Sequence, residues 1–136
     1  MPADLMLDFH SPCGQYKLTF DDDGKVAYAY LKRDKNIVGD VWLYNRCPTP
    51  EQPEWTDRNN IPLALSKEYI TERGRIVAEL ARSDIAVDWE YVNDQPVVYV
   101  YVFEDLYGVV GVGDRPGFSR FAIRDSPLGR VMEIED

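Results

Sequence analysis

In residues 85–91 the side chains of Ile85, Val87, Trp89 and Tyr91 alternate with Ala86, Asp88 and Glu90, and this period of two predicts a β-strand rather than a helix. The runs 85–91 and 97–103 flank the turn-forming sequence Asn93-Asp94-Gln95-Pro96, so we expect a β-hairpin with Val92 paired to Val97. Because successive side chains of a strand point to opposite faces, this register assigns one face to the core. The core face carries Ile85, Val87, Trp89, Tyr91, Val98, Val100 and Val102.

The opposite face of this hairpin gathers carboxylates and aromatic rings. Residues 83–114 contain seven carboxylates and no lysine or arginine. Acidic groups steer a cationic partner toward the surface, and flat rings supply contact area once it arrives. We therefore predict a binding surface for a basic protein, formed by Asp88, Glu90, Tyr99, Tyr101, Phe103, Glu104 and Trp55.

Trp55 belongs to a separate segment that is rich in proline. Pro48, Pro50 and Pro53 precede it, and proline can neither donate to a β-ladder nor sit inside a helix. We expect a long surface loop here, with Trp55 as its anchor.

The remaining pattern predicts more strands and one helix. Residues 5–9, 16–20 and 118–123 alternate, and residues 26–31, 38–44 and those from 109 onward are also predicted as strands. Ser66 can cap a helix in which Tyr69, Ile70 and Val77 recur at helical spacing, although Gly74 costs about 1 kcal/mol relative to alanine. We predict an α+β fold: a predominantly antiparallel, curved β-sheet with one main helix, about residues 66–82, packed on one face, in a single domain of residues 1–136.

Composition limits the classes of partner and the compartment. The formal net charge of -9 disfavours nucleic acids and anionic membranes as ligands and favours basic proteins. The chain has no long apolar run, and its first residues lack the basic start of a signal peptide. Together with two widely separated cysteines, which favour reduced thiols, this predicts a cytoplasmic protein.

No motif indicates a catalytic, metal or cofactor site. His10 is the single histidine, and Asp21-Asp22-Asp23-Gly24 lacks the spacing of a calcium loop, so we expect a hairpin turn with solvated acids. The glycines of residues 108–117 lead into a proline and a strand rather than a helix, which argues against a phosphate-binding loop.

These observations predict a non-enzymatic, acidic protein-binding module that needs no cofactor and is a monomer or weak homodimer. In size, charge and surface chemistry the chain is similar to the bacterial immunity proteins, and this resemblance implies an inhibitor of a basic toxin such as a nuclease.

Two alternative functions stay open. One is a small-ligand-binding protein or enzyme with a pocket between helix and sheet, lined by Tyr28, Tyr30, Trp42 and Trp89. The other is an assembly protein that pairs through a strand edge. A further alternative bears on the acidic surface itself, because Arg120 or Arg124 could neutralise it from within the molecule.

Overall fold

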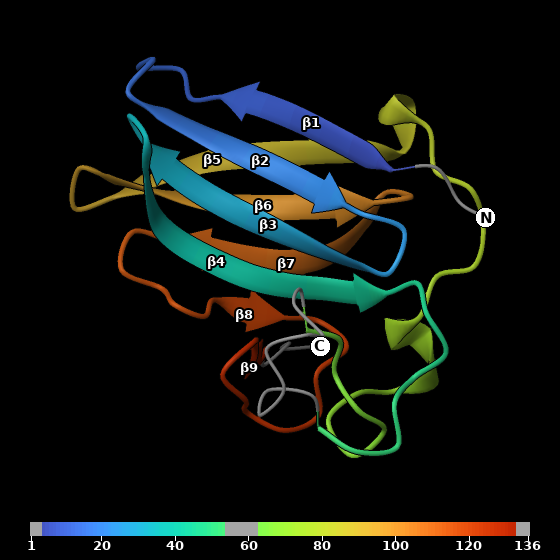
Figure 1. Ribbon diagram of the computed structural model, residues 1–136. Helices are drawn as coiled ribbons and strands as arrows, with labels where there is room; N and C mark the ends of the chain where they lie inside the picture. Colours follow the sequence, from blue (N-terminus) through green and yellow to red (C-terminus); the bar gives the residue numbers. More distant parts are fainter. Residues whose placement is uncertain (1–3, 54–62, 133–136) are drawn as a thin grey trace.

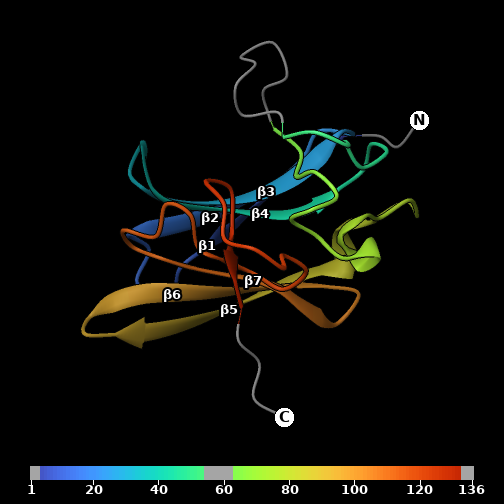
Figure 2. The same cartoon turned by 90° about the horizontal axis from the view of Figure 1, so that it is seen from below.

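Two β-sheets lie face to face and enclose the main core (Figure 1). The computed structural model describes residues 4–53 and 63–132. Figure 2 shows the two sheets as separate layers when the molecule is viewed along their planes. The architecture is a sandwich, the arrangement in which two amphipathic sheets bury their apolar faces against each other.

The first sheet is an antiparallel meander in the order β1-β2-β3-β4. Its strands are β1 (Leu5–His10), β2 (Tyr16–Asp22), β3 (Val26–Arg33) and β4 (Asn36–Asn45). Each lies where the alternating pattern predicts a strand, and short turns join neighbours in the chain. Gly24 in the β2–β3 turn has a φ of 90°, a conformation that glycine adopts without steric cost.

The second sheet has the order β5-β6-β7-β8-β9. Its strands are β5 (Ile85–Val92), β6 (Gln95–Val102), β7 (Asp105–Gly111), β8 (Phe118–Ser119) and β9 (Arg130–Val131). All neighbours are antiparallel except β8 and β9. The strand predicted at 118–123 is shorter than expected, because the chain leaves the sheet after Ser119.

The inner faces of both sheets supply the core. Leu18, Leu31 and Val41 from the first sheet and Val98 and Val100 from the second are completely buried. Val98 and Val100 are among the residues that the hairpin pattern assigns to the core face.

The sandwich is closed along one side, where β4 meets the end of the chain. Asp40 N donates to Asp114 O at 2.9 Å, and Trp42 N donates to Leu128 O at 2.9 Å, so loop backbone covers the edge of β4. At Gly39 the layers approach so closely that a Cβ would lie 2.6 Å from the carbonyl oxygen of Gly111. The opposite side, between β1 and β5, has no such backbone cover among the residues described.

The predicted α+β class is wrong, because no main helix packs on a sheet in the described chain. In residues 63–84 the described helical elements are two 3-10 turns, η2 (Glu72–Gly74) and η3 (Arg82–Asp84). The rest of the segment is irregular, with single β-bridges at Ile70 and Arg75, and Ile76 N donates to Asn45 O at 2.9 Å. Gly74 fits tightly against Trp42, since a Cβ added at this glycine would lie only 3.1 Å from the indole ring. Pairing with the end of β4 therefore overrides the helical spacing of the apolar residues.

This irregular segment covers part of the outer face of the first sheet. There a second, smaller cluster forms from Val26, Tyr28, Trp42, Leu65 and Ile70. In the part of the chain that is described, no helix has the length and apolar character needed to cross a membrane.

Candidate protein-binding face

The outer face of the β5–β6 hairpin carries the acids and rings that the alternation assigns to it. Asp88 lies opposite Tyr99, and Glu90 lies opposite Val97. The turn is two residues long, Asn93 and Asp94, rather than four, so Val92 pairs with Gln95 instead of Val97. This correction shifts the register by two residues, which leaves the side chains within β5 and β6 on their predicted faces.

The two turn residues explain the tighter hairpin. Asn93 and Asp94 have φ values of 53° and 64°. A two-residue turn with positive φ at both positions matches the twist of the strands, and Asn and Asp adopt it more readily than most residues.

A hydrogen bond joins an acid and a ring on this face. The Tyr99 hydroxyl donates to Glu90 Oε2 at 2.7 Å. That bond to the carboxylate, helped by partial burial, raises the pKa of Tyr99. Tyr99 and Tyr101 are half-buried, whereas the carboxylates of Asp88 and Glu90 are exposed. The face therefore presents exposed carboxylates beside half-buried tyrosine rings, one of which is held by a hydrogen bond.

Phe103 and Glu104 lie beside this face rather than on it. They form the β6–β7 turn, with φ values of 51° and 70°, and both are exposed. Phe103 N donates to Asp84 O at 2.9 Å, which holds the turn next to the start of β5. The structure thus brings Asp88, Glu90, Tyr99 and Tyr101 together and places Phe103 and Glu104 at one end. Trp55 lies outside the described residues.

Several arginines of the described chain contact groups other than the acids of this face. Arg124 pairs with Glu68 at 3.2 Å, and the Arg120 guanidinium lies over the Phe121 ring, 5.8 Å from its centroid. Further arginine pairs join Arg46 to Asp22, Arg73 to Asp105, Arg115 to Asp40 and Arg130 to Asp114. Over residues 4–53 and 63–132 no ion pair includes Asp88, Glu90 or Glu104.

The face continues across the rest of the sheet, which the sequence reasoning missed. Register aligns one residue from each strand in a single row: Asp88, Tyr99, Val109, Phe118 and Arg130. The row ends at the Arg130 guanidinium, which lies over the Phe118 ring, 4.2 Å from its centroid, and pairs with Asp114 at 3.1 Å. The sequence predicts strands at Val109 and Phe118, but β8 and β9 have only two residues each, so no pattern showed that these residues share a face with Asp88 and Arg130.

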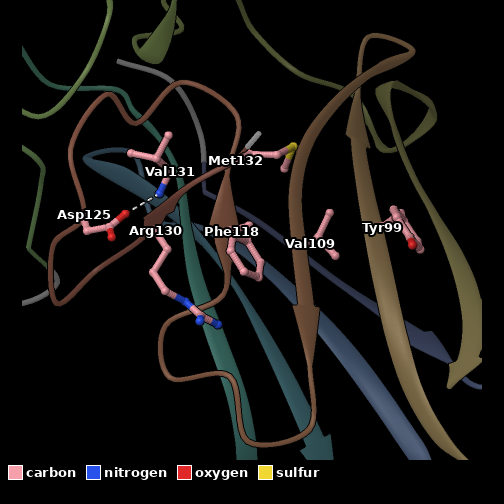
Figure 3. Close-up of a pocket in the computed structure, with 7 residues that line it drawn as sticks. All are labelled: Tyr99, Val109, Phe118, Asp125, Arg130, Val131 and Met132. Atoms are coloured by element: carbon pink, nitrogen blue, oxygen red, sulfur yellow. Dashed lines mark hydrogen bonds between the residues drawn. The ribbon is translucent and has the colours of Figure 1, made fainter. Parts of the chain in front are cut away.

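A shallow hollow of about 620 Å³ occupies the far half of the row. Figure 3 shows the residues that line it, with Asp125 accepting a hydrogen bond from Val131 N. The lining residues are Tyr99, Val109, Phe118, Asp125, Arg130, Val131 and Met132. One surface thus combines exposed acids at β5, apolar and aromatic groups in the middle, and a paired arginine at β9.

The aromatic residues predicted to line a small-ligand pocket do not converge. Tyr28 and Tyr30 stack on the outer side of the first sheet, with ring centroids 5.9 Å apart. Trp42 is completely buried there, whereas Trp89 belongs to the second sheet. The pocket expected between helix and sheet is therefore absent from the described part of the chain, since the main helix is absent too.

Reactive side chains are sparse in the described residues. They include no group of three or more His, Cys, Asp or Glu residues able to hold a metal ion. Asp22 is completely buried rather than solvated as expected, and Arg46 Nε donates to it at 2.8 Å.

Cys13 is an exposed free thiol in the β1–β2 turn. Hydrogen bonds at 3.3 Å with the Ser11 hydroxyl and from the Tyr91 hydroxyl lower the pKa of Cys13 to about 7. Its side-chain partners are hydroxyl groups, so the contacts stabilise a thiolate without supplying an imidazole base.

Comparison of the chain with protein-family models, curated proteins and solved structures found no match. A functional argument for this protein therefore depends on the chemistry of its own surface.

Proposed function

We propose that this protein is a non-enzymatic binding protein that holds a basic protein partner on the outer face of β5 and β6. The observation that carries the proposal is the lack of an internal counter-ion for Asp88 and Glu90 within the described residues. Charges already neutralised inside a protein contribute little to steering, whereas exposed charges remain available to a cationic partner.

The neighbouring rings support protein binding over simple ion binding. Tyr99 and Tyr101 are half-exposed beside the acids, and Phe103 is 42% exposed at the adjoining turn. An arginine or lysine of a partner can pair with Asp88 or Glu90 while its stem lies across a tyrosine ring. Aromatic residues of this kind commonly provide a large part of the affinity of a protein interface.

Inhibition is the specific form that we propose. A domain of 136 residues with a net charge of -9 can cover a basic active site, such as that of a toxic nuclease, and compete with its anionic substrate. This is the role implied by the similarity in size and charge to the bacterial immunity proteins. The free thiol of Cys13 is compatible with the reducing cytoplasm, which we propose as the compartment.

Affinity capture from the source organism tests this function. We expect the wild-type protein to retain a basic protein at low salt and to release much of it as ionic strength rises. Asp88→Lys and Glu90→Lys should each weaken retention by about tenfold or more, because a like charge then faces the partner. Glu79→Lys is the matched control, since it changes the net charge equally at an exposed site outside this face.

The captured protein must then be tested for inhibition. Its catalytic activity should fall on stoichiometric addition of the wild-type chain and persist with Asp88→Lys. If all three charge reversals leave the same captured proteins in the same amounts, the proposed function is wrong.

A further inference from the structure

Strand β5 lies at the margin of its sheet and leaves one side of its backbone unpaired. In the order β5-β6-β7-β8-β9 it has a single neighbour, β6. At its start Asp84 N donates to Ala81 O and Ile85 N to Arg82 O, within the η3 turn, but no loop backbone of the described chain bonds to residues 86–92. Strand β4, by contrast, is covered along its edge by Asp114 and Leu128.

The hairpin register shows which backbone groups face away from β6. Phe103 N donates to Asp84 O at 2.9 Å, so even-numbered residues of this strand turn their N–H and C=O groups toward β6. The two-residue turn agrees, because it makes Val92 and Gln95 a hydrogen-bonded pair. The odd-numbered residues Val87, Trp89 and Tyr91 therefore direct their backbone groups toward the open side.

This edge has no proline, bulge or basic residue to prevent strand addition, and its charged side chains, Asp88 and Glu90, repel acidic strands rather than basic ones. Strand β5 is eight residues long, pairs with β6 in unbroken register, and contains no proline, lysine or arginine. Natural edge strands are commonly shortened, bulged, or protected by proline or lysine. The exposed backbone here is thus a template for one further strand.

The side chains of β5 specify the chemistry of that strand. Asp88 and Glu90 point to the outer face, whereas Val87 and Trp89 are half-buried on the inner face. A neighbouring strand places its own side chains beside these, so cations belong on its outer face and apolar groups on its inner face.

We propose that the open edge of β5 accepts an extended segment of the basic partner as an added β-strand, in which lysine or arginine alternates with apolar residues. This inference rests on the proposed function and specifies how that partner is held. Backbone hydrogen bonds supply affinity in this mode of recognition, and the alternate side chains supply specificity.

Two other pairings fit the charges less well. A second copy of β5, added antiparallel about Trp89, would set Asp88 of one copy opposite Glu90 of the other, and like charges placed opposite each other are destabilising. The other open edge, β1, carries Asp8, which already accepts a hydrogen bond from Thr19 at 2.8 Å and lies 3.8 Å from Lys17 Nζ.

The test uses the full chain and a synthetic peptide of about eight residues, which matches the length of β5. One peptide alternates lysine and valine, and its control has the same composition with the lysines and valines in two blocks. Binding and backbone amide exchange are measured by NMR. We expect the alternating peptide to bind at least about tenfold more tightly and to slow amide exchange at Val87, Trp89 and Tyr91.

Proline variants separate backbone pairing from side-chain contact. Val87→Pro removes an outward N–H without breaking a bond to β6, so we expect it to fold and to lose peptide binding. Val87→Ala should bind the peptide normally. Met6→Pro is the control at the other open edge. Ser11 N donates to Tyr16 O, so the odd-numbered residues of β1 turn their backbone groups toward β2 and Met6 directs its own outward. This variant should also bind the peptide.

Equal binding of the two peptides, or equal binding by Val87→Pro and Val87→Ala, would overturn edge pairing. If Val87→Pro fails to fold, amide exchange in the wild-type chain decides, and unchanged exchange at Val87, Trp89 and Tyr91 is the refuting result. A third result would separate the two proposals. If Asp88→Lys loses peptide binding but the peptide does not slow amide exchange at Val87, Trp89 and Tyr91 in the wild-type chain, the acidic face is still a binding surface and only the added strand is rejected.

Discussion

The Tyr99 hydroxyl and the Glu90 carboxylate meet at 2.7 Å across the β5–β6 ladder, diagonally rather than between directly paired residues. A neutral donor thus orients Glu90 without cancelling its negative charge. The bond keeps the carboxylate beside the ring, where a cation from a partner can contact both groups.

This contact predicts the titration of Tyr99. Glu90→Ala removes the main cause of the raised pKa, so the pKa of Tyr99 should fall toward its ordinary value. Because the folded-state pKa is raised, the contribution of Tyr99 to stability is complete below pH about 10 and is lost as pH rises through the folded-state value. NMR titration of the tyrosine ring measures the shift, and Asp88→Asn, which leaves the hydrogen bond in place, should not move it.

The face on which each side chain of β5 and β6 lies could be predicted, because a register error of two residues does not move any side chain to the opposite face. The turn length could not, since the positive φ of Asn93 and Asp94 is one of several conformations open to that sequence. The continuation of the face to Phe118 and Arg130 depends on strands too short to show a period. Long-range pairing, rather than local pattern, positions that half.

The predicted helix is also absent because of contacts between residues far apart in the chain. Ile70 and Val77 have helical spacing, yet Ile70 is buried whereas Val77 is 69% exposed. The Arg46 side chain donates to the carbonyl oxygens of Ile76 and Ala78, which holds this part of the segment next to the end of β4 rather than in a helix. Contacts with a residue 30 positions earlier in the chain are not visible in a local pattern.

Gly74→Ala gives opposite results for a helix and for the observed structure. In an exposed helix, alanine would increase stability by about 1 kcal/mol. Here the added methyl group would lie 3.1 Å from the completely buried Trp42 ring, so we expect a loss of about 1–3 kcal/mol. Urea denaturation measures the sign. Val77→Ala is the control and should change stability by less than about 0.5 kcal/mol, because its side chain is exposed.

The buried pair of Asp22 and Arg46 should be essential to stability. Its two side chains are 0% and 2% exposed, and Asp22 also accepts a hydrogen bond from the Tyr44 hydroxyl at 2.7 Å. Arg46→Met leaves an unpaired buried carboxylate and should reduce the free energy of unfolding by about 3–5 kcal/mol. Adding Asp22→Asn should recover part of that loss. Arg124→Met, at the exposed pair with Glu68, should cost less than about 1 kcal/mol, and an equal loss in both single variants would contradict this assignment.

The thiol of Cys13 should react with alkylating reagents near neutral pH. Hydrogen bonds with Ser11 and Tyr91 lower its pKa to about 7, so a substantial fraction is thiolate at that pH. In a Cys47→Ser background, which leaves one cysteine, the rate of iodoacetamide labelling should therefore rise as the pH passes through the pKa of about 7. Ser11→Ala and Tyr91→Phe each remove a stabilising contact, so each should shift the pH profile upward and slow labelling at neutral pH while leaving the rate at high pH nearly unchanged. Tyr99→Phe is the control, since this tyrosine bonds Glu90 instead, and a matching shift in that variant would contradict the assignment.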